Sequence, residues 1–166
     1  MVDDANGPEV PQDSVPRPRT LGEIGLQNFA PYLMNRIMGR YNQSLHEQLG
    51  KAGLSVAKMR ALAVLSVIDG LMTNELAVYA VIEQSTLSRT LDALEADNLI
   101  RREAGERDSR VRHIFITEAG RETFLGIWPI VADAYGAMFT GIDADEHDRF
   151  LATLNKILRN IRKHEL

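Results

Sequence analysis

The sequence contains no cysteine, and this absence excludes several classes of protein at once. Without cysteine there can be no disulfide framework, thiol catalysis, thiol redox switch or cysteine-ligated zinc site. The chain also lacks an apolar run of the roughly 20 residues that a membrane-spanning helix needs. Nor is there an excess of positive charge, since 19 basic and 23 acidic residues give a net charge of −4. A protein that coats DNA non-specifically through a uniformly basic surface is therefore excluded.

Patterns typical of enzymes and metal proteins are also missing from the chain. His46-Glu47 begins like a metalloprotease motif, but Gly50 stands where the second histidine must be. Asp143 and Asp145 alternate like the acids of a calcium loop, without that loop's glycine and its terminal glutamate. The four histidines offer no ligand pair at helical spacing. We therefore expect no enzyme activity, no metal site and no cofactor.

The remaining composition is that of one folded domain with a polar arm. At 166 residues, of which 45% are hydrophobic, the chain is long and apolar enough to bury a core. Proline-rich sequence and the lack of an apolar segment at the start predict a flexible arm rather than a signal peptide. We therefore expect an arm over residues 1–28, a single domain over residues 29–166, and a cytoplasmic protein that does not contact membranes.

Hydrophobic periodicity predicts mostly helices. Apolar residues recur at helical spacing in four segments: about 29–50, 56–69, 74–80 and 84–96. Ser55 and Thr73 are predicted to cap the second and third segments, and Asn98 to end the fourth in the left-handed conformation. The row predicted to be buried in the fourth segment is Leu87, Leu91 and Leu94. The period then changes to that of strands in residues 99–104 and 111–116, which predicts a β-hairpin with a polar tip. Two further helices are predicted after Thr117 and Asp143, with a kink at Pro129 in the first of them.

The order helix, tight turn, helix, charged hairpin is that of a winged helix-turn-helix, whose second helix enters the major groove of DNA. Such a helix needs short polar side chains and no acids at its start. The segment from residue 84 has six polar residues on its expected exposed face: Gln84, Ser85, Thr86, Ser88, Arg89 and Thr90. Their hydroxyls suit phosphates or bases, and Gln and Arg can form bidentate contacts with bases. An ordinary amphipathic surface helix is the alternative for this segment alone.

The predicted hairpin adds a second candidate contact with DNA. Arg107, Arg110 and Arg112 lie at its tip and flank, and the minor groove or its phosphates would attract them. Asp108 is unsuited to facing phosphate, so we expect it to pair with an arginine and hold the shape of the tip. From residue 84 to residue 116 six arginines balance six acids. Attraction to DNA therefore depends on the positions and orientations of the arginine side chains.

Short motifs between Leu54 and Gly120 together resemble the MarR family of bacterial transcriptional regulators. In chain order they are Leu54-Ser55, Thr73-Asn74-Glu75-Leu76-Ala77, Ser85-Thr86-Leu87-Ser88-Arg89 with Leu94-Glu95, Asp108-Ser109-Arg110 and Ile116-Thr117-Glu118-Ala119-Gly120. Two features depart from the family pattern. Asn98 stands where a glycine usually ends the recognition helix, and the turn at Val81-Ile82 is more apolar than expected.

The resemblance implies a mainly α fold with a small β-hairpin wing, in which the winged helix-turn-helix spans about residues 54–117. Helices at about 29–50 and 118–164 then form the dimerisation arms of a homodimer, which suits a palindromic operator in double-stranded DNA. The implied function is sequence-specific regulation of transcription, most often repression, with a small-molecule effector as a further partner. A winged module that binds another protein, without specific DNA binding, is the alternative function.

Overall fold

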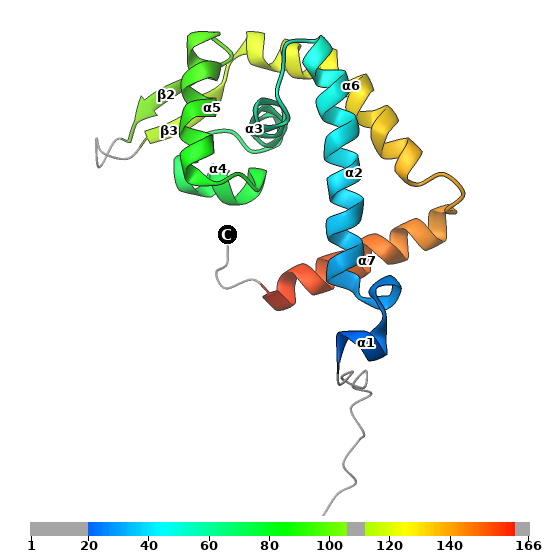
Figure 1. Ribbon diagram of the computed structural model, residues 1–166. Coiled ribbons are helices and arrows are strands. Elements are labelled where there is room, and N and C mark those ends of the chain that lie inside the picture. Colours follow the sequence, from blue (N-terminus) through cyan, green and yellow to red (C-terminus); the bar gives the residue numbers. More distant parts are fainter. Residues whose placement is uncertain (1–19, 106–111, 162–166) are drawn as a thin grey trace, which may run out of the picture. The chain divides into compact units, whose positions relative to one another are not determined.

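The computed structural model describes residues 20–105 and 112–161 (Figure 1). These residues are mostly helical, with one three-stranded antiparallel sheet, which confirms the predicted fold class of a mainly α protein with a small β wing. The chain forms two compact units, residues 1–39 and 40–166. Within the described ranges, no helix is long and apolar enough to cross a membrane.

The first unit contains a short helical segment where the sequence predicted an arm. Helix α1 (Leu21–Ile24) and the 3-10 turn η1 (Leu26–Asn28) precede helix α2 (Ala30–Lys51), which continues into the second unit. A reciprocal cap starts α1, since Thr20 N donates to the Glu23 carboxylate and Glu23 N donates to the Thr20 hydroxyl. Local capping therefore forms a helical turn immediately after the proline-rich stretch.

Apart from the short strand β1, the second unit follows the predicted order of elements: α3 (Val56–Val67), β1 (Leu71–Met72), α4 (Thr73–Ala80), α5 (Gln84–Ala96), β2 (Ile100–Ala104), β3 (Arg112–Ile116), α6 (Glu118–Met138) and α7 (Ala144–Ile161). Ser55 and Thr117 cap α3 and α6 as predicted, each accepting a hydrogen bond from a backbone N–H three residues later. Helix α4 begins one residue earlier than predicted, so Met72 rather than Thr73 is its N-cap. Pro129 lies inside α6, which is continuous through that position.

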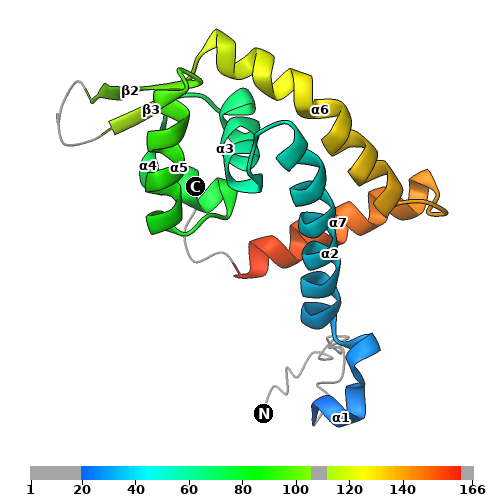
Figure 2. The same cartoon turned by 45° about the horizontal axis from the view of Figure 1, so that its top comes forward.

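The sheet has the strand order β1-β3-β2, and in both views the hairpin of β2 and β3 lies beside α5 (Figures 1 and 2). Strand β1 was not predicted, because two residues are too short to show an alternating pattern. This strand exists through its partner: Leu71 pairs with Ile114 and Met72 pairs with His113. The pairing ties the start of α4 to the base of the wing.

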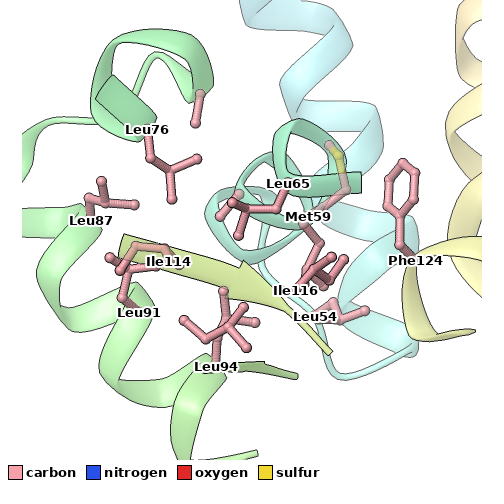
Figure 3. Close-up of a cluster of buried hydrophobic side chains, with 14 of the residues drawn as sticks. Leu54, Met59, Leu65, Leu76, Leu87, Leu91, Leu94, Ile114, Ile116 and Phe124 are labelled. Carbon is pink, nitrogen blue, oxygen red and sulfur yellow. The ribbon is translucent and has the colours of Figure 1, made fainter. Parts of the chain in front are cut away.

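One hydrophobic core joins the sheet to the helices around it. Figure 3 shows Leu87, Leu91 and Leu94 of α5 directed toward the strand that carries Ile114. All four of these side chains are buried. The row predicted to be buried on α5 is therefore confirmed, and its burial sets which face of the helix remains exposed.

The start of α6 is packed against the end of α5. Asn98 adopts the left-handed conformation (φ 58°) that the sequence predicted at this helix end. The Thr117 hydroxyl donates to Asn98 O at 2.8 Å, and Thr117 N donates to Leu99 O at 3.1 Å. A Cβ atom at Gly120 would overlap Leu99 O. The motif Thr-x-x-Gly therefore has a structural reason. Thr117 caps α6, and the missing side chain of Gly120 lets α6 approach the turn after α5.

Candidate nucleic-acid interface

A tight turn joins α4 to α5 and sets their crossing. Val81 lies in the left-handed region (φ 52°, ψ 52°), and Ile82 N donates to Ala77 O at 3.0 Å. Arg60 of α3 donates to Val81 O at 3.3 Å and, through its other terminal nitrogen, to Asn42 Oδ1 at 2.8 Å. A guanidinium therefore fixes the turn to two other helices, and a β-branched side chain occupies a backbone conformation that suits Gly or Asn.

The N-terminal half of α5 presents a polar face to solvent. Five of the six residues predicted for this face are exposed: Gln84, Ser85, Thr86, Ser88 and Arg89. Arg89 Nε donates to Ser85 O at 3.3 Å, so the arginine side chain lies back along the first turn of the helix. The first turn of α5 contains no acidic residue. These groups offer hydroxyl, amide and guanidinium donors at the end of a helix where the dipole also favours negative charge.

Thr90 does not belong to this face, and the prediction that it is exposed is wrong. Its side chain is buried, and its hydroxyl donates to Thr86 O at 2.8 Å. The physical reason is helical geometry, because residue 90 lies three residues after Leu87 and therefore on the same side of α5 as the buried row. A threonine can be buried there because its hydroxyl finds an acceptor on its own helix.

The wing carries the second predicted group of residues. Arg112 is exposed at the start of β3, two positions before the buried Ile114 and therefore on the same face of the strand. Arg107, Asp108 and Arg110 lie outside the residues that the structure describes. Of the predicted wing residues, Arg112 is thus the one whose position is established.

A group of side chains that the sequence did not predict joins the wing to α5. Arg102 of β2 forms ion pairs with Asp92 and Glu95 of α5, at 2.7 and 3.1 Å. Beside these pairs is an open cleft with a volume of about 460 Å³, lined by residues of α4, α5 and the wing: Thr73, Ser88, Leu91, Glu95, Arg102 and Arg112. Alternation along the strand was the available signal, because it places an arginine at an inward position between apolar ones.

Comparison with known proteins assigns the fold to a family. The MarR family model matches residues 52–111. A MarR family transcriptional regulator from Silicibacter pomeroyi, known from its crystal structure, is 53% identical, with a TM-score of 0.83; the match covers 89% of this chain and all of that one. The transcriptional repressor IacR of Pseudomonas putida is 24% identical over 139 residues, which are 84% of this chain and 83% of the relative.

A third relative is known with a small molecule bound. CouR from Rhodococcus jostii, in a structure with p-coumaroyl-CoA, is 25% identical to this chain, with a TM-score of 0.69. The match covers 80% of this chain and 94% of CouR. The 53% identity to the Silicibacter pomeroyi regulator over its full length, together with the helix-turn-helix and wing described above, establishes the relationship. The chain belongs to the MarR family of transcriptional regulators.

Proposed function

We propose that this protein is a homodimeric repressor that binds a specific palindromic sequence in double-stranded DNA and releases it in response to a small molecule. It binds rather than catalyses, and it acts in the cytoplasm, where its operator DNA would lie. The observation that carries the proposal is the polar face of α5, which is exposed and free of acids in its first turn. Such a face fits the major groove, where base edges present hydrogen-bond donors and acceptors.

In this proposal the residues of α5 and the wing have separate roles. Arg89 and Gln84 read base edges, while Ser85, Thr86 and Ser88 contact phosphates or bases near the N-terminus of α5. Arg112, together with Arg107 and Arg110, contacts the flanking minor groove or its phosphates. Asp108 holds the shape of the wing tip. Thr90 has no contact with DNA, because its side chain is buried.

The homodimer is supported by the exposed apolar surface of α7. No residue of this 18-residue helix is buried, although apolar residues recur along it at helical spacing. Its large exposed hydrophobic side chains are Phe150, Leu151, Leu158 and Ile161. A helix of this kind is stabilised by burying its apolar stripe, and a second copy of the chain supplies the matching surface. A two-fold dimer then presents two α5 helices to two half-sites about one helical turn apart.

Control by a small molecule is supported by a relative. CouR is known in complex with p-coumaroyl-CoA, and this chain shares its fold over most of its length. An effector weakens DNA binding only if it prefers an arrangement of the two α5 helices that does not fit the operator. The chain has no cysteine, so such a switch in this protein depends on binding rather than on thiol oxidation.

Selection of bound sequences from a random duplex pool tests the proposal. A two-fold symmetric consensus with half-sites about 10 base pairs apart is the expected result. The logarithm of the binding constant should also fall linearly with the logarithm of salt concentration, because phosphate contacts release counterions. The main alternative is a winged module that binds another protein. Absence of duplex binding at low salt would overturn the proposal in favour of that alternative.

A further inference from the structure

Arg102 occupies a position on β2 where an apolar residue is expected. Along this edge strand the side chains alternate between two faces, and Ile100, on the same face as Arg102, is buried. Arg102 is also paired across the ladder with Ile114, which is fully buried. The side chain of Arg102 is therefore directed to the side of the sheet that packs on α5, with 24% of it exposed.

The guanidinium of Arg102 is held between two carboxylates that are one turn apart on α5. Its Nη2 atom lies 2.7 Å from Asp92 Oδ1, and its Nη1 atom lies 3.1 Å from Glu95 Oε2. Because the two terminal nitrogens of a guanidinium are fixed in one plane, contacts to both define the direction of the side chain better than a single contact does. The two pairs thus relate the orientation of β2 to the axis of α5.

Both apolar packing and an open cleft lie between the wing and α5. Leu94 and Ile100 are buried where β2 begins. The cleft of about 460 Å³ lies beside this packing, and it is lined by Ser88 and Leu91 of α5 and by Arg112 of β3. In a packed core, side chains fill such a space and resist rotation. Here the pairs of Arg102 with Asp92 and Glu95 span the boundary of the cleft instead.

We propose that Arg102, held by Asp92 and Glu95, is a positioning residue that sets the angle between the wing and α5. At this angle both elements reach the same duplex, so the inference rests on the proposed DNA-binding function. It deepens that function by assigning a role to two acids on a DNA-binding surface. Without the pairs only apolar packing would set the orientation of the wing on α5, and Arg112 of β3 would no longer be held at a fixed place relative to α5.

The direction in which DNA affinity changes when Asp92 and Glu95 are neutralised distinguishes a positioning role from simple repulsion between these acids and phosphate. Acidic residues near DNA repel phosphate, so their removal ordinarily strengthens binding. The segment from residue 84 to residue 116 has no net charge, so each acid removed there makes it more positive. If Asp92 and Glu95 position the wing, removing their charges weakens binding instead.

The first experiment compares wild type, Asp92→Asn/Glu95→Gln and Asp97→Asn in a salt titration on one duplex. Asp97 is the matched control, because it lies at the end of α5 but pairs with Lys58 of α3, at 2.6 Å, rather than with the wing. We expect the double variant to bind several-fold more weakly, with a salt slope smaller by about one unit for each phosphate that the wing no longer neutralises. Asp97→Asn should bind as well as wild type or better. Equal or tighter binding by the double variant overturns the inference.

A second experiment distinguishes positioning from direct contact of Arg102 with DNA. Arg102→Gln is combined with Arg107→Ala/Arg110→Ala in a double-mutant cycle. If Arg102 acts through the wing, its substitution has little further effect on DNA binding once Arg107 and Arg110 have been replaced. If it contacts DNA itself, its substitution weakens binding by the full factor in that background too, and the proposed role is wrong.

A third measurement needs no DNA. Because the native chain has no cysteine, spin labels attach only to cysteines that are introduced. Nitroxide labels are placed at Val67→Cys, where the native side chain is 83% exposed at the end of α3, and at Glu103→Cys, an exposed position on β2. Labelled subunits are diluted into unlabelled protein, so that the distance within one subunit is measured. We expect a broader distance distribution in Asp92→Asn/Glu95→Gln than in Asp97→Asn or wild type, and an unchanged distribution overturns the inference. A wild type that binds no duplex would contradict the proposed function, while these distances would still decide the role of Arg102.

Discussion

The carboxylate of Asp69 joins the base of the wing to Arg121 at the start of α6. Asp69 Oδ2 lies 3.1 Å from Arg121 Nη2, while Oδ1 accepts hydrogen bonds from Ile116 N at 2.9 Å and Gly70 N at 3.1 Å. Arg121 Nη1 also donates to Ser66 O at 3.3 Å. One carboxylate therefore connects the segment after α3, the last residue of β3 and the helix that leaves the winged module.

We expect Asp69→Ala to lower the free energy of unfolding by about 1–3 kcal/mol, because it leaves the N–H of the buried Ile116 without its acceptor. Urea denaturation measures the change. The control is Asp148→Ala on α7, where the native side chain is 82% exposed, and it should change stability by less than about 0.5 kcal/mol. Equal effects of the two substitutions would show that the Asp69 contacts do not stabilise the fold.

Two glycines of α6 should respond in opposite ways to alanine. A Cβ atom at Gly120 would overlap Leu99 O, whereas one at Gly126 meets no atom within 4 Å. Gly120→Ala should therefore destabilise the protein by about 1–3 kcal/mol through overpacking. Gly126→Ala should stabilise it by up to about 1 kcal/mol through helix propensity. Thermal unfolding of the two variants checks both signs, and a stable Gly120→Ala protein would contradict the close approach of α6 to Leu99.

The strained turn between α4 and α5 should be improved by asparagine. Val81 has a left-handed backbone conformation with 77% of its surface exposed, so its side chain gains little from packing. Val81→Asn should raise the free energy of unfolding by about 1 kcal/mol, because Asn tolerates this conformation. Val78→Asn is the control on α4, at an exposed helical position, where Val and Asn have similar helix propensities. Chemical denaturation should show a gain for Val81→Asn alone.

Ser88 and Thr90 are two residues apart on α5 and should differ in their effect on DNA binding. Ser88 is exposed, and Thr90 is buried with its hydroxyl bonded to Thr86 O. Fluorescence anisotropy with the selected operator should show weaker binding for Ser88→Ala and unchanged binding for Thr90→Val.

In the same assay Arg89→Ala should weaken binding and also change which DNA sequence the protein prefers, since a base contact contributes about 1–3 kcal/mol of discrimination. Equally weakened binding to every sequence would assign Arg89 to the DNA backbone.

A charge on the apolar surface of α7 should separate the proposed dimer. Leu158 is 49% exposed in the single chain, and burying a glutamate at an interface is costly. Leu158→Glu should therefore shift the protein from dimer to monomer in sedimentation equilibrium and weaken operator binding. Lys156→Glu introduces the same side chain at an exposed polar position of the same helix and should leave the dimer intact. Dimers in both variants would argue against an interface at Leu158.

Local signals in the sequence were enough for most elements of the fold. The buried row Leu87, Leu91 and Leu94 predicted α5 with its bounds, and Ser55 and Thr117 predicted the starts of their helices. These signals succeed because periodicity and capping depend on residues within one or two turns. They failed for Thr90, because its hydroxyl makes it polar by composition while a bond to Thr86 O lets it be buried.

Residue pairs distant in the chain could not be found in this way. Strand β1 exists through Leu71 and Ile114, and the ion pairs of Arg102 connect a strand to the preceding helix. No periodicity marks such pairs, since they depend on where the packed core places each backbone. By itself the sequence determined the family, the order of the elements and the polar face of α5, because these are local patterns. Only the tertiary structure decided how α5, the wing and α6 are joined, because Arg102 and Asp69 act across elements that packing brings together.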